Sequence, residues 1–339
     1  MTQKVVLITG CSSGIGLALA ARIAKDEKKR FMVYATMRNL SKCEPLVEAA
    51  GRTLGRTLEI KQLDVCDEAS IKACVDSLPE RRVDILISNA GMGLIGPIEC
   101  HSIDEMKAIM DTNFFGFVRL LKEVLPDMKR RKMGHIVVIS SVMGIQGILF
   151  NDIYAASKFA LEGFCESLAV QALSFKLNIS LIEPGPVITE FERKVYDEGL
   201  KTDLNKADSV TANMFTNIYL KNYKQIFETF GQTAEDIAEH TLKIITMKNP
   251  PFRHQTNTVY TPMTTLKYAD PEVSNAGMGL IGPIECRSID EMKTVMDTNF
   301  FGFVRLLKEV LPDMKRRKRG HIVVISSVMY IQGEDKTLS

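Results

Sequence analysis

Tyr154 and Lys158 form the pair of side chains in this sequence best suited to chemistry. Residues four apart share one face of a helix, so the phenol and the ammonium would lie together. A phenol can donate a proton to the alkoxide formed when a carbonyl is reduced, and can take it back in the reverse reaction. A free tyrosine has a pKa of about 10, and we expect the ammonium and the charge of a cofactor to lower it. On its own, however, this spacing is common on helix surfaces.

Two further polar residues fit the same chemistry. Ser141 directly follows an apolar stretch and would hold the substrate oxygen. Asn113 lies inside a long helical stretch, where its amide can divert a backbone carbonyl to a water and feed a proton chain towards Lys158. We therefore predict that Asn113, Ser141, Tyr154 and Lys158 form a catalytic set that interconverts a carbonyl and an alcohol.

A glycine-rich turn, residues 10–16, joins the first apolar stretch to the first helical one. Glycines let the backbone approach a pyrophosphate, and the N-terminus of the following helix offers free N–H groups and a positive dipole end. The position of this turn between a strand and a helix favours a dinucleotide site over an ordinary tight turn.

The end of the second apolar stretch indicates which dinucleotide would bind. An acidic residue there would bind a ribose 2′-hydroxyl, whereas a basic residue would bind a 2′-phosphate. The sequence has Arg38 and no acid in residues 34–38, and Ser12 could add a hydroxyl. These residues predict NADP(H), although Arg38 could also be a solvated loop cation.

Two other strand ends complete the predicted cofactor site. Asp64 would bind the adenine edge, since the alternative role of capping helix 67–78 is better filled by Asp67. The small residues Asn89, Ala90 and Gly91 would let the cofactor lie against the backbone.

Short apolar stretches alternate with longer stretches of helical periodicity. The expected strands are 5–9, 31–35, 58–63, 85–88, 135–140, 179–182 and a short one at 258–261. The expected helices are 14–28, 67–78, 102–131, 154–175 and 233–247. This alternation predicts an α/β fold, a doubly wound, Rossmann-like parallel sheet of about seven strands with helices on both faces. The ligand would bind at the carboxyl ends of the strands.

Residues 274–333 nearly repeat residues 88–147. The two copies differ at five of 60 positions, which are His101/Arg287, Ala108/Thr294, Ile109/Val295, Met133/Arg319 and Gly144/Tyr330. The second copy has neither the glycine-rich turn nor the Tyr-x-x-x-Lys pair, so it cannot form its own active site. We expect a catalytic domain at 1–271 and a loosely packed, appended repeat at 272–339. A gene-assembly artefact, or competition with 88–147 for one place in the sheet, stays open.

Composition narrows the class of protein. The chain has 339 residues, 45% hydrophobic and 25% charged, with a net charge of +2, which indicates a globular protein without a nucleic-acid partner. The seven cysteines are scattered and the histidines show no ligand spacing, so we expect a reducing compartment and no metal. No signal peptide and no apolar span are seen. We expect a cytoplasmic protein. The basic stretches 129–132 and 315–319 keep peripheral membrane contact open, with cationic helix ends as the alternative.

Together these motifs resemble the short-chain dehydrogenase/reductase family over about residues 3–265. The match comprises 9–16, 89–91, Asn113, Ser141, Tyr154, Lys158 and Pro184-Gly185. The resemblance implies that residues 184–189 cover the nicotinamide, with Thr189 near its amide. The predicted cofactor-binding residues are Thr9, Gly10, Ser12, Ser13, Gly14, Ile15, Gly16, Arg38, Asp64, Val65, Asn89, Ala90, Gly91, Lys158, Pro184, Gly185, Val187 and Thr189.

Residues 150–163 resemble two branches of that family equally, the estrogen-type 17-beta-hydroxysteroid dehydrogenases and the photoreceptor all-trans-retinol dehydrogenases. Residues 252–257, 260–262 and 266–271 look closer to the retinol branch. The resemblance implies an NADP(H)-dependent enzyme for all-trans-retinol and retinal. A 17-beta-hydroxysteroid enzyme is the alternative and a non-catalytic dinucleotide-binding scaffold is the second one.

The resemblance also bears on partners. The substrate would be a small apolar molecule, and we expect it to contact Ser141, Met143, Leu149 and Tyr154. In the family, dimers or tetramers are common through the helices at about 112–131 and 154–175, so a homodimer stays open. The tail that meets a membrane in the retinol branch is replaced here by the repeat.

Overall fold

A seven-stranded parallel sheet forms the centre of the protein. The computed structural model describes residues 3–261, 264, 288–322 and 324. The strands are β1 Lys4–Ile8, β2 Phe31–Met37, β3 Leu58–Gln62, β4 Ile85–Ser88, β5 Gly134–Ile139, β6 Leu177–Glu183 and β7 Arg253–Gln255. Their order is β3-β2-β1-β4-β5-β6-β7, and all neighbours are parallel. The predicted doubly wound α/β fold is confirmed.

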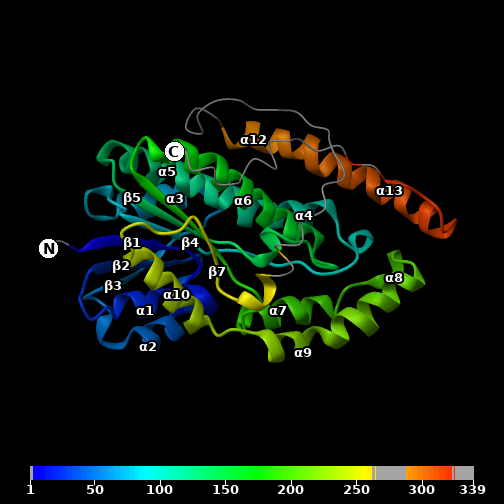
Figure 1. Cartoon of the computed structure of the whole chain (residues 1–339), viewed down its shortest axis with the longest axis horizontal. Coiled ribbons are helices and arrows are strands. Elements are labelled where there is room, and N and C mark those ends of the chain that lie inside the picture. The colour runs from blue at the N-terminus through cyan, green and yellow to red at the C-terminus, as the bar shows by residue number, and fades with distance from the viewer. Residues whose placement is uncertain (1–2, 262–263, 265–287, 323, 325–339) are drawn as a thin grey trace.

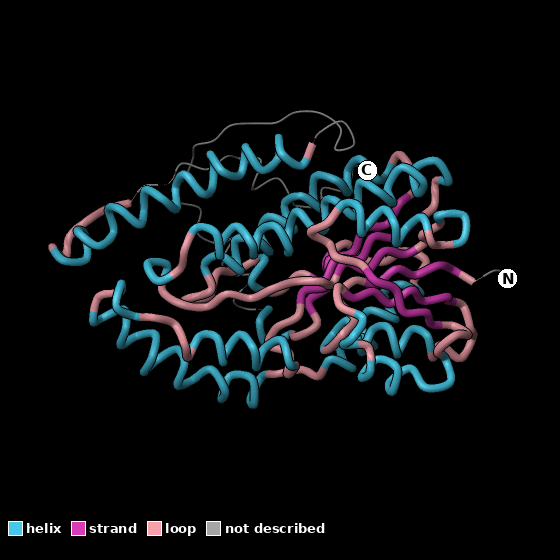
Figure 2. Tube along the Cα trace, turned by 180° about the vertical axis from the view of Figure 1, so that it is seen from behind, coloured by secondary structure: helices cyan, strands magenta, loops and turns pink. Residues whose placement is uncertain are grey.

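Two layers of helices cover the sheet, and Figure 2 shows the strands between them. On one face lie α1 Gly14–Ala24, α2 Glu44–Ala50 and α10 Ala234–Thr246, and on the other α3 Glu68–Asp76, α5 Gly116–Arg131 and α6 Asp152–Leu173. Because both faces are covered, the strands are almost continuous apolar runs, as in Val5-Val6-Leu7-Ile8, where every residue is buried.

The expected helix at 102–131 is interrupted. It consists of α4 Ile103–Met110, a π-helical turn Asp111–Phe115 and α5. Ser102 and Glu105 form a capping box that starts α4. The π-turn is notable because such turns occur often at functional sites, and Asn113 is at its centre.

The expected strand at 258–261 is wrong. Residues Thr258–Tyr260 form a 3-10 turn that is capped by the side chain of Asn257, which accepts a hydrogen bond from the N–H of Val259. The seventh strand is instead Arg253–Gln255, which pairs with β6. The charged and polar side chains of this short strand conceal it in the sequence.

Three helices that the sequence pattern did not indicate lie beyond the sheet. They are α7 Glu190–Gly199, α8 Ser209–Asn213 and α9 Lys221–Phe230, with a π-turn Met214–Leu220 between the last two. They extend away from α1 and α2, as Figure 1 shows. Their aromatic side chains form a separate cluster around the buried Phe215.

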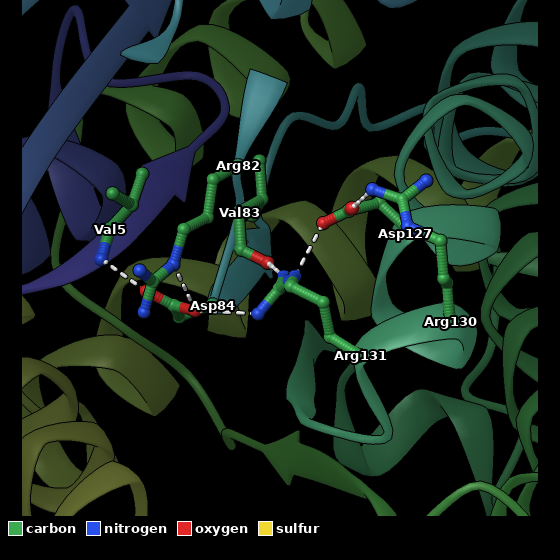
Figure 3. A network of polar contacts seen from close by, with 7 residues as sticks. All are labelled: Val5, Arg82, Val83, Asp84, Asp127, Arg130 and Arg131. Carbon is green, nitrogen blue, oxygen red and sulfur yellow. Dashed lines mark hydrogen bonds and ion pairs between the residues drawn. The ribbon is translucent and has the colours of Figure 1, made fainter. Parts of the chain in front are cut away.

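A network of arginines and aspartates ties the end of α5 to the sheet (Figure 3). The nearly buried Asp84 accepts hydrogen bonds from the N–H of Val5 (2.9 Å), from Arg82 Nε (2.9 Å) and from Arg131 Nη1 (2.9 Å). Arg131 also donates to the carbonyl of Val83 and pairs with Asp127. Arg131 of the basic stretch 129–132 is therefore used within the fold.

The second copy repeats the helical pattern of the first. Its described part contains α12 Ile289–Met296, a π-turn Asp297–Phe301 and α13 Gly302–Arg316. These helices lie along α4 (Figure 1), and Ile289, Phe301 and Val304 are buried. The first copy supplies β5 and Ser88, the last residue of β4, to the sheet. The domain boundary near 271 lies outside the described residues, and loose packing of the repeat stays a prediction.

Candidate active site

A cavity opens at the carboxyl ends of the strands. Most residues predicted to bind a dinucleotide line it, and they are Gly10, Ser12, Ser13, Gly14, Ile15, Arg38, Asp64, Val65, Asn89, Ala90, Gly91, Lys158, Pro184, Gly185, Val187 and Thr189. Thr9 and Gly16 do not line it. The sheet topology thus brings side chains from five strand ends together at one place.

Thr9 and Asn89 hold the floor of this first cavity. Thr9 Oγ1 accepts hydrogen bonds from the N–H groups of Asn89 (3.0 Å) and Ala90 (3.0 Å). In return, Asn89 Nδ2 donates to the carbonyl of Thr9 (2.9 Å). Thr9 therefore faces the protein, and its contribution to a bound ligand would be to fix the loops after β1 and β4.

The glycines of the first turn are required by close approach. Gly10 and Gly14 have φ values of +72° and +57°, which side chains rarely adopt. A Cβ on Gly16 would lie 2.3 Å from the carbonyl oxygen of Gly10, so Gly16 shapes the turn from behind. Among the described residues, no side chain caps the N-terminus of α1. Its first N–H groups are thus available to an anion, and the cradle fits a pyrophosphate.

Arg38 and Asp64 stand at the outer part of the first cavity. Arg38 is exposed, as a cation that meets a 2′-phosphate would be. Asp64 Oδ1 accepts a hydrogen bond from the N–H of Cys66 (2.9 Å), and its own N–H donates to Ser70. Asp67 caps α3 through the N–H of Ala69, as expected. Asp64 is therefore held in place without serving as the helix cap.

Ser141, Tyr154 and Lys158 meet where the first cavity adjoins a second one. All three line the first cavity, and Ser141 and Tyr154 also line the second. Lys158 is buried, its Nζ donates to the carbonyl of Ile139 (2.9 Å), and it lies 5.6 Å from the ring centre of Tyr154. The phenol thus lies at the boundary between the first cavity and the second one.

Burial dominates the acid–base properties of this pair. It raises the pKa of the Tyr154 phenol well above its usual range, and the carboxylate of Glu192 raises it further, against a hydrogen bond with Ser141. Burial also lowers the pKa of Lys158 to about 8. The expected lowering of the tyrosine pKa is therefore wrong for the chain's own residues, because desolvation of the phenol is the largest influence on it. The other part of that expectation, that the charge of a bound cofactor lowers the pKa of Tyr154, stays a prediction.

Asn113 lies behind the two cavities and lines neither. Its Oδ1 accepts from the N–H of Met92 (2.7 Å), while its Nδ2 donates to the carbonyl of Met92 (2.8 Å) and to Ser157 Oγ (2.9 Å). Asn113 therefore joins the π-turn to the loop after β4 and to α6, the helix that carries Tyr154 and Lys158. Its predicted part in a proton chain towards Lys158 stays a prediction.

The second cavity has a volume of about 310 Å³ and mostly apolar walls. Its wall includes Met143, as predicted, and aromatic residues from α9 and the preceding π-turn, among them Tyr219, Tyr223 and Phe227. Leu149 lies outside both cavities and is 48% exposed, so it does not contact a ligand bound there. The sequence placed Leu149 near the site, but the chain turns it outward.

Glu192 is the charged residue among the described residues that line the second cavity, and the sequence did not reveal it. It lies on α7 beside Tyr154 and lines both cavities. Desolvation raises the pKa of its carboxyl to about 8. Among the described residues it has no ion-pair partner. In the sequence nothing distinguishes it from the exposed Glu190 two residues earlier.

Comparison with known proteins agrees with this geometry. The short chain dehydrogenase family model matches residues 4–199 and 224–337, and the chain belongs to this family of oxidoreductases. Human retinol dehydrogenase 8 is 53% identical over 267 residues, covering 79% of this chain and 86% of that protein. Human 17-beta-hydroxysteroid dehydrogenase type 1 is 46% identical over 278 residues, covering 81% and 84%.

A solved structure also matches the fold. Actinorhodin polyketide ketoreductase with NADPH superposes with a TM-score of 0.62 at 25% identity, covering 75% of this chain and 95% of that one. In the part of the chain that the structure describes, no helix is both long and apolar enough to cross a membrane.

Proposed function

We propose that this oxidoreductase uses NADP(H) to interconvert an apolar alcohol and its aldehyde or ketone, with all-trans-retinol and retinal as the first substrate pair. The observation that carries the proposal is the position of Tyr154 and Ser141, which line both the first cavity and the apolar second cavity. A group that gives a proton to a substrate in the second cavity, while a dinucleotide in the first cavity supplies the hydride, must border both cavities. The bound dinucleotide would supply or accept the hydride.

The chain's own residues would act on the proton and on the substrate oxygen. Ser141 Oγ would hold that oxygen, and the phenol of Tyr154 would donate its proton to the oxygen as negative charge develops there. Lys158, held by the carbonyl of Ile139, would stabilise the phenolate left behind. In the oxidative direction the same phenolate would accept the alcohol proton.

Tyr154→Phe tests this mechanism. We expect the turnover of all-trans-retinal with NADPH to fall by orders of magnitude, because the ring remains while the transferable proton is lost. Binding of NADPH, measured by fluorescence, should stay within a few-fold of the unchanged protein. Near-normal turnover would exclude the mechanism. A non-catalytic scaffold, the second alternative, predicts no turnover in either protein.

Arg38 supports the choice of NADP(H) over NAD(H). It is exposed at the outer part of the first cavity, beside the position expected for the adenosine ribose. Arg38→Asp should weaken NADPH binding at least tenfold and strengthen NADH binding, since a carboxylate repels the 2′-phosphate and accepts from the 2′-hydroxyl. Equal affinities of the unchanged protein for both cofactors would contradict the assignment.

Retinoid and steroid substrates are both compatible with apolar walls. The greater identity to retinol dehydrogenase 8 than to 17-beta-hydroxysteroid dehydrogenase type 1 favours the retinoid. Comparing kcat/KM for all-trans-retinal and estrone, each with NADPH, separates the two. A clear preference for estrone would make the steroid alternative correct while leaving the roles of Tyr154 and Lys158 unchanged.

A further inference from the structure

The contact between the two copies of the repeated segment is symmetric. Lys107 of the first copy pairs with Asp297 of the second at 2.9 Å, and Lys293 of the second pairs with Asp111 of the first at 2.7 Å. Lys293 and Asp297 are the repeat equivalents of Lys107 and Asp111. Each ion pair is therefore the image of the other, with the two copies exchanged.

The aromatic contacts obey the same relation. The ammonium of Lys107 lies 5.7 Å from the ring centre of Phe301, and that of Lys293 lies 5.6 Å from the ring centre of Phe115. Phe301 is the repeat equivalent of Phe115. The pairing of early with late positions shows that α4 and α12 run antiparallel, as a two-fold axis between them requires.

A cavity lies between the two helices, and its walls match as well. Besides the residues just named, it is lined by the equivalent pairs Asp104/Asp290 and Ala108/Thr294, together with Met110 and Thr298. A contact in which residue i meets j and j meets i is called isologous, and it is the type that joins two identical subunits in a two-fold dimer. Here it forms inside one chain.

We propose that Lys107 of α4 and Asp111 and Phe115 of the following π-turn form a self-pairing surface, which residues 288–316 occupy within the same chain in place of a second copy of the protein. The segment thereby keeps the chain monomeric. A released segment leaves α4 free to meet the α4 of another molecule, with Lys107 of each opposite Asp111 of the other. Phe115 belongs to the stretch 112–131, one of the two helices through which the resembled family forms dimers or tetramers, so the segment covers part of that expected interface.

Two features hold the segment on this surface. Phe301 and Val304 are buried in one apolar cluster with Met106, Ile109 and Met110 of α4. At the far end of α13, Lys315 pairs with Glu99 and with Asp208, the residue that caps α8. The second contact has no part in the symmetric pairing and adds to the occupancy within the chain.

The test compares molar masses by light scattering after gel filtration. We expect the full chain to be monomeric, at 37.9 kDa. Phe301→Asp with Val304→Asp puts carboxylates among the apolar residues and should release the segment, so that the mass doubles. Lys293→Glu with Asp297→Lys, at two half-exposed positions, is a second release variant that does not alter buried positions.

Adding Lys107→Glu to either release variant should restore the monomer, because the introduced carboxylate would then face Asp111 of the other chain. Adding Lys25→Glu, at the exposed end of α1, is the matched control and should leave the dimer intact. Trypsin sensitivity of α13 reports release. A monomer in both release variants, whether the segment is cleaved or protected, would overturn the proposal, as would a dimer formed by the unchanged chain. Thermal unfolding checks that each variant is folded.

Discussion

Arg253 holds three carboxylates at the edge of the sheet behind the catalytic helix. Its guanidinium contacts Glu162 (2.6 Å), Glu183 (2.7 Å) and Glu166, and the carboxylates of Glu162 and Glu183 are almost fully buried. Burial raises the pKa of Glu183 to about 8, and it raises that of Glu162 as well, in both cases against the guanidinium. Arg253→Met removes the cation and keeps a stem of similar length.

We expect this variant to lose about 3 kcal/mol of unfolding free energy at pH 7. Glu183 is already largely protonated at that pH, so its loss of the cation adds little. Glu162 would lose the guanidinium that acts against the burial-raised pKa of its carboxyl, so its carboxyl would be driven further towards the neutral form. The ordinary range for breaking a buried ion pair is about 3–5 kcal/mol.

The pH dependence gives the sharper test. A carboxyl whose pKa is raised by folding keeps a proton that the unfolded chain loses, so stability falls as pH rises above about 4.5. The difference between Arg253→Met and the unchanged protein should therefore shrink as pH falls from 7 to 5. Urea unfolding followed by circular dichroism at both pH values measures it. Glu183→Gln, the control, should cost less than about 1 kcal/mol, the value of one neutral hydrogen bond.

A loss below about 1 kcal/mol for Arg253→Met at pH 7 would refute this reasoning, because the guanidinium would then not be what makes the buried carboxylates tolerable. An equal loss at pH 5 and pH 7 would also refute it, since it would place the cost in packing instead of in proton uptake.

Three other substitutions have defined outcomes. Glu192→Gln removes the charge that raises the pKa of Tyr154, so the rise of alcohol oxidation with pH should move to lower pH in a profile of kcat/KM; a move to higher pH would contradict this. Gly16→Ala puts a methyl group against the carbonyl of Gly10. Overpacking of this kind costs about 1–3 kcal/mol, so NADPH affinity should fall tenfold or more in a fluorescence titration. Unchanged affinity would show that the turn can relax. Asp84→Asn takes the buried carboxylate away from the half-buried Arg82 and Arg131, and chemical unfolding should show a loss of about 3 kcal/mol; a change under about 0.5 kcal/mol would mean that the network adds nothing.

The fold was largely predictable because both faces of the sheet are covered. That covering makes most of the strands apolar runs, although the edge strand β3 contains Glu59 and Lys61. The positions of six strands were predicted to within a few residues. The seventh strand could not be found this way, because Arg253 is charged and its partners Glu162 and Glu183 are distant in sequence. The helices around the second cavity have mixed polar and aromatic sequences without a clear signal.

The candidate site was predictable where backbone geometry restricts residue type. Gly10 and Gly14 have positive φ, and the four-residue spacing of Tyr154 and Lys158 follows from the helix. Glu192 was missed because its burial depends on α7 folding over the cavity. The sign of the Tyr154 pKa shift was missed for the same reason, since desolvation is a property of the packed protein.

The symmetric contact between α4 and α12 has a consequence for how this surface can change over time. In a dimer of identical chains, one mutation near the two-fold axis appears on both sides at once, so only self-compatible changes survive. Within one chain the two sides are separate codons. Ala108/Thr294 and Ile109/Val295, two of the five differences between the copies, are adjacent to the residues that form this contact. A surface that began as two identical halves can thus become two halves that differ and still complement each other.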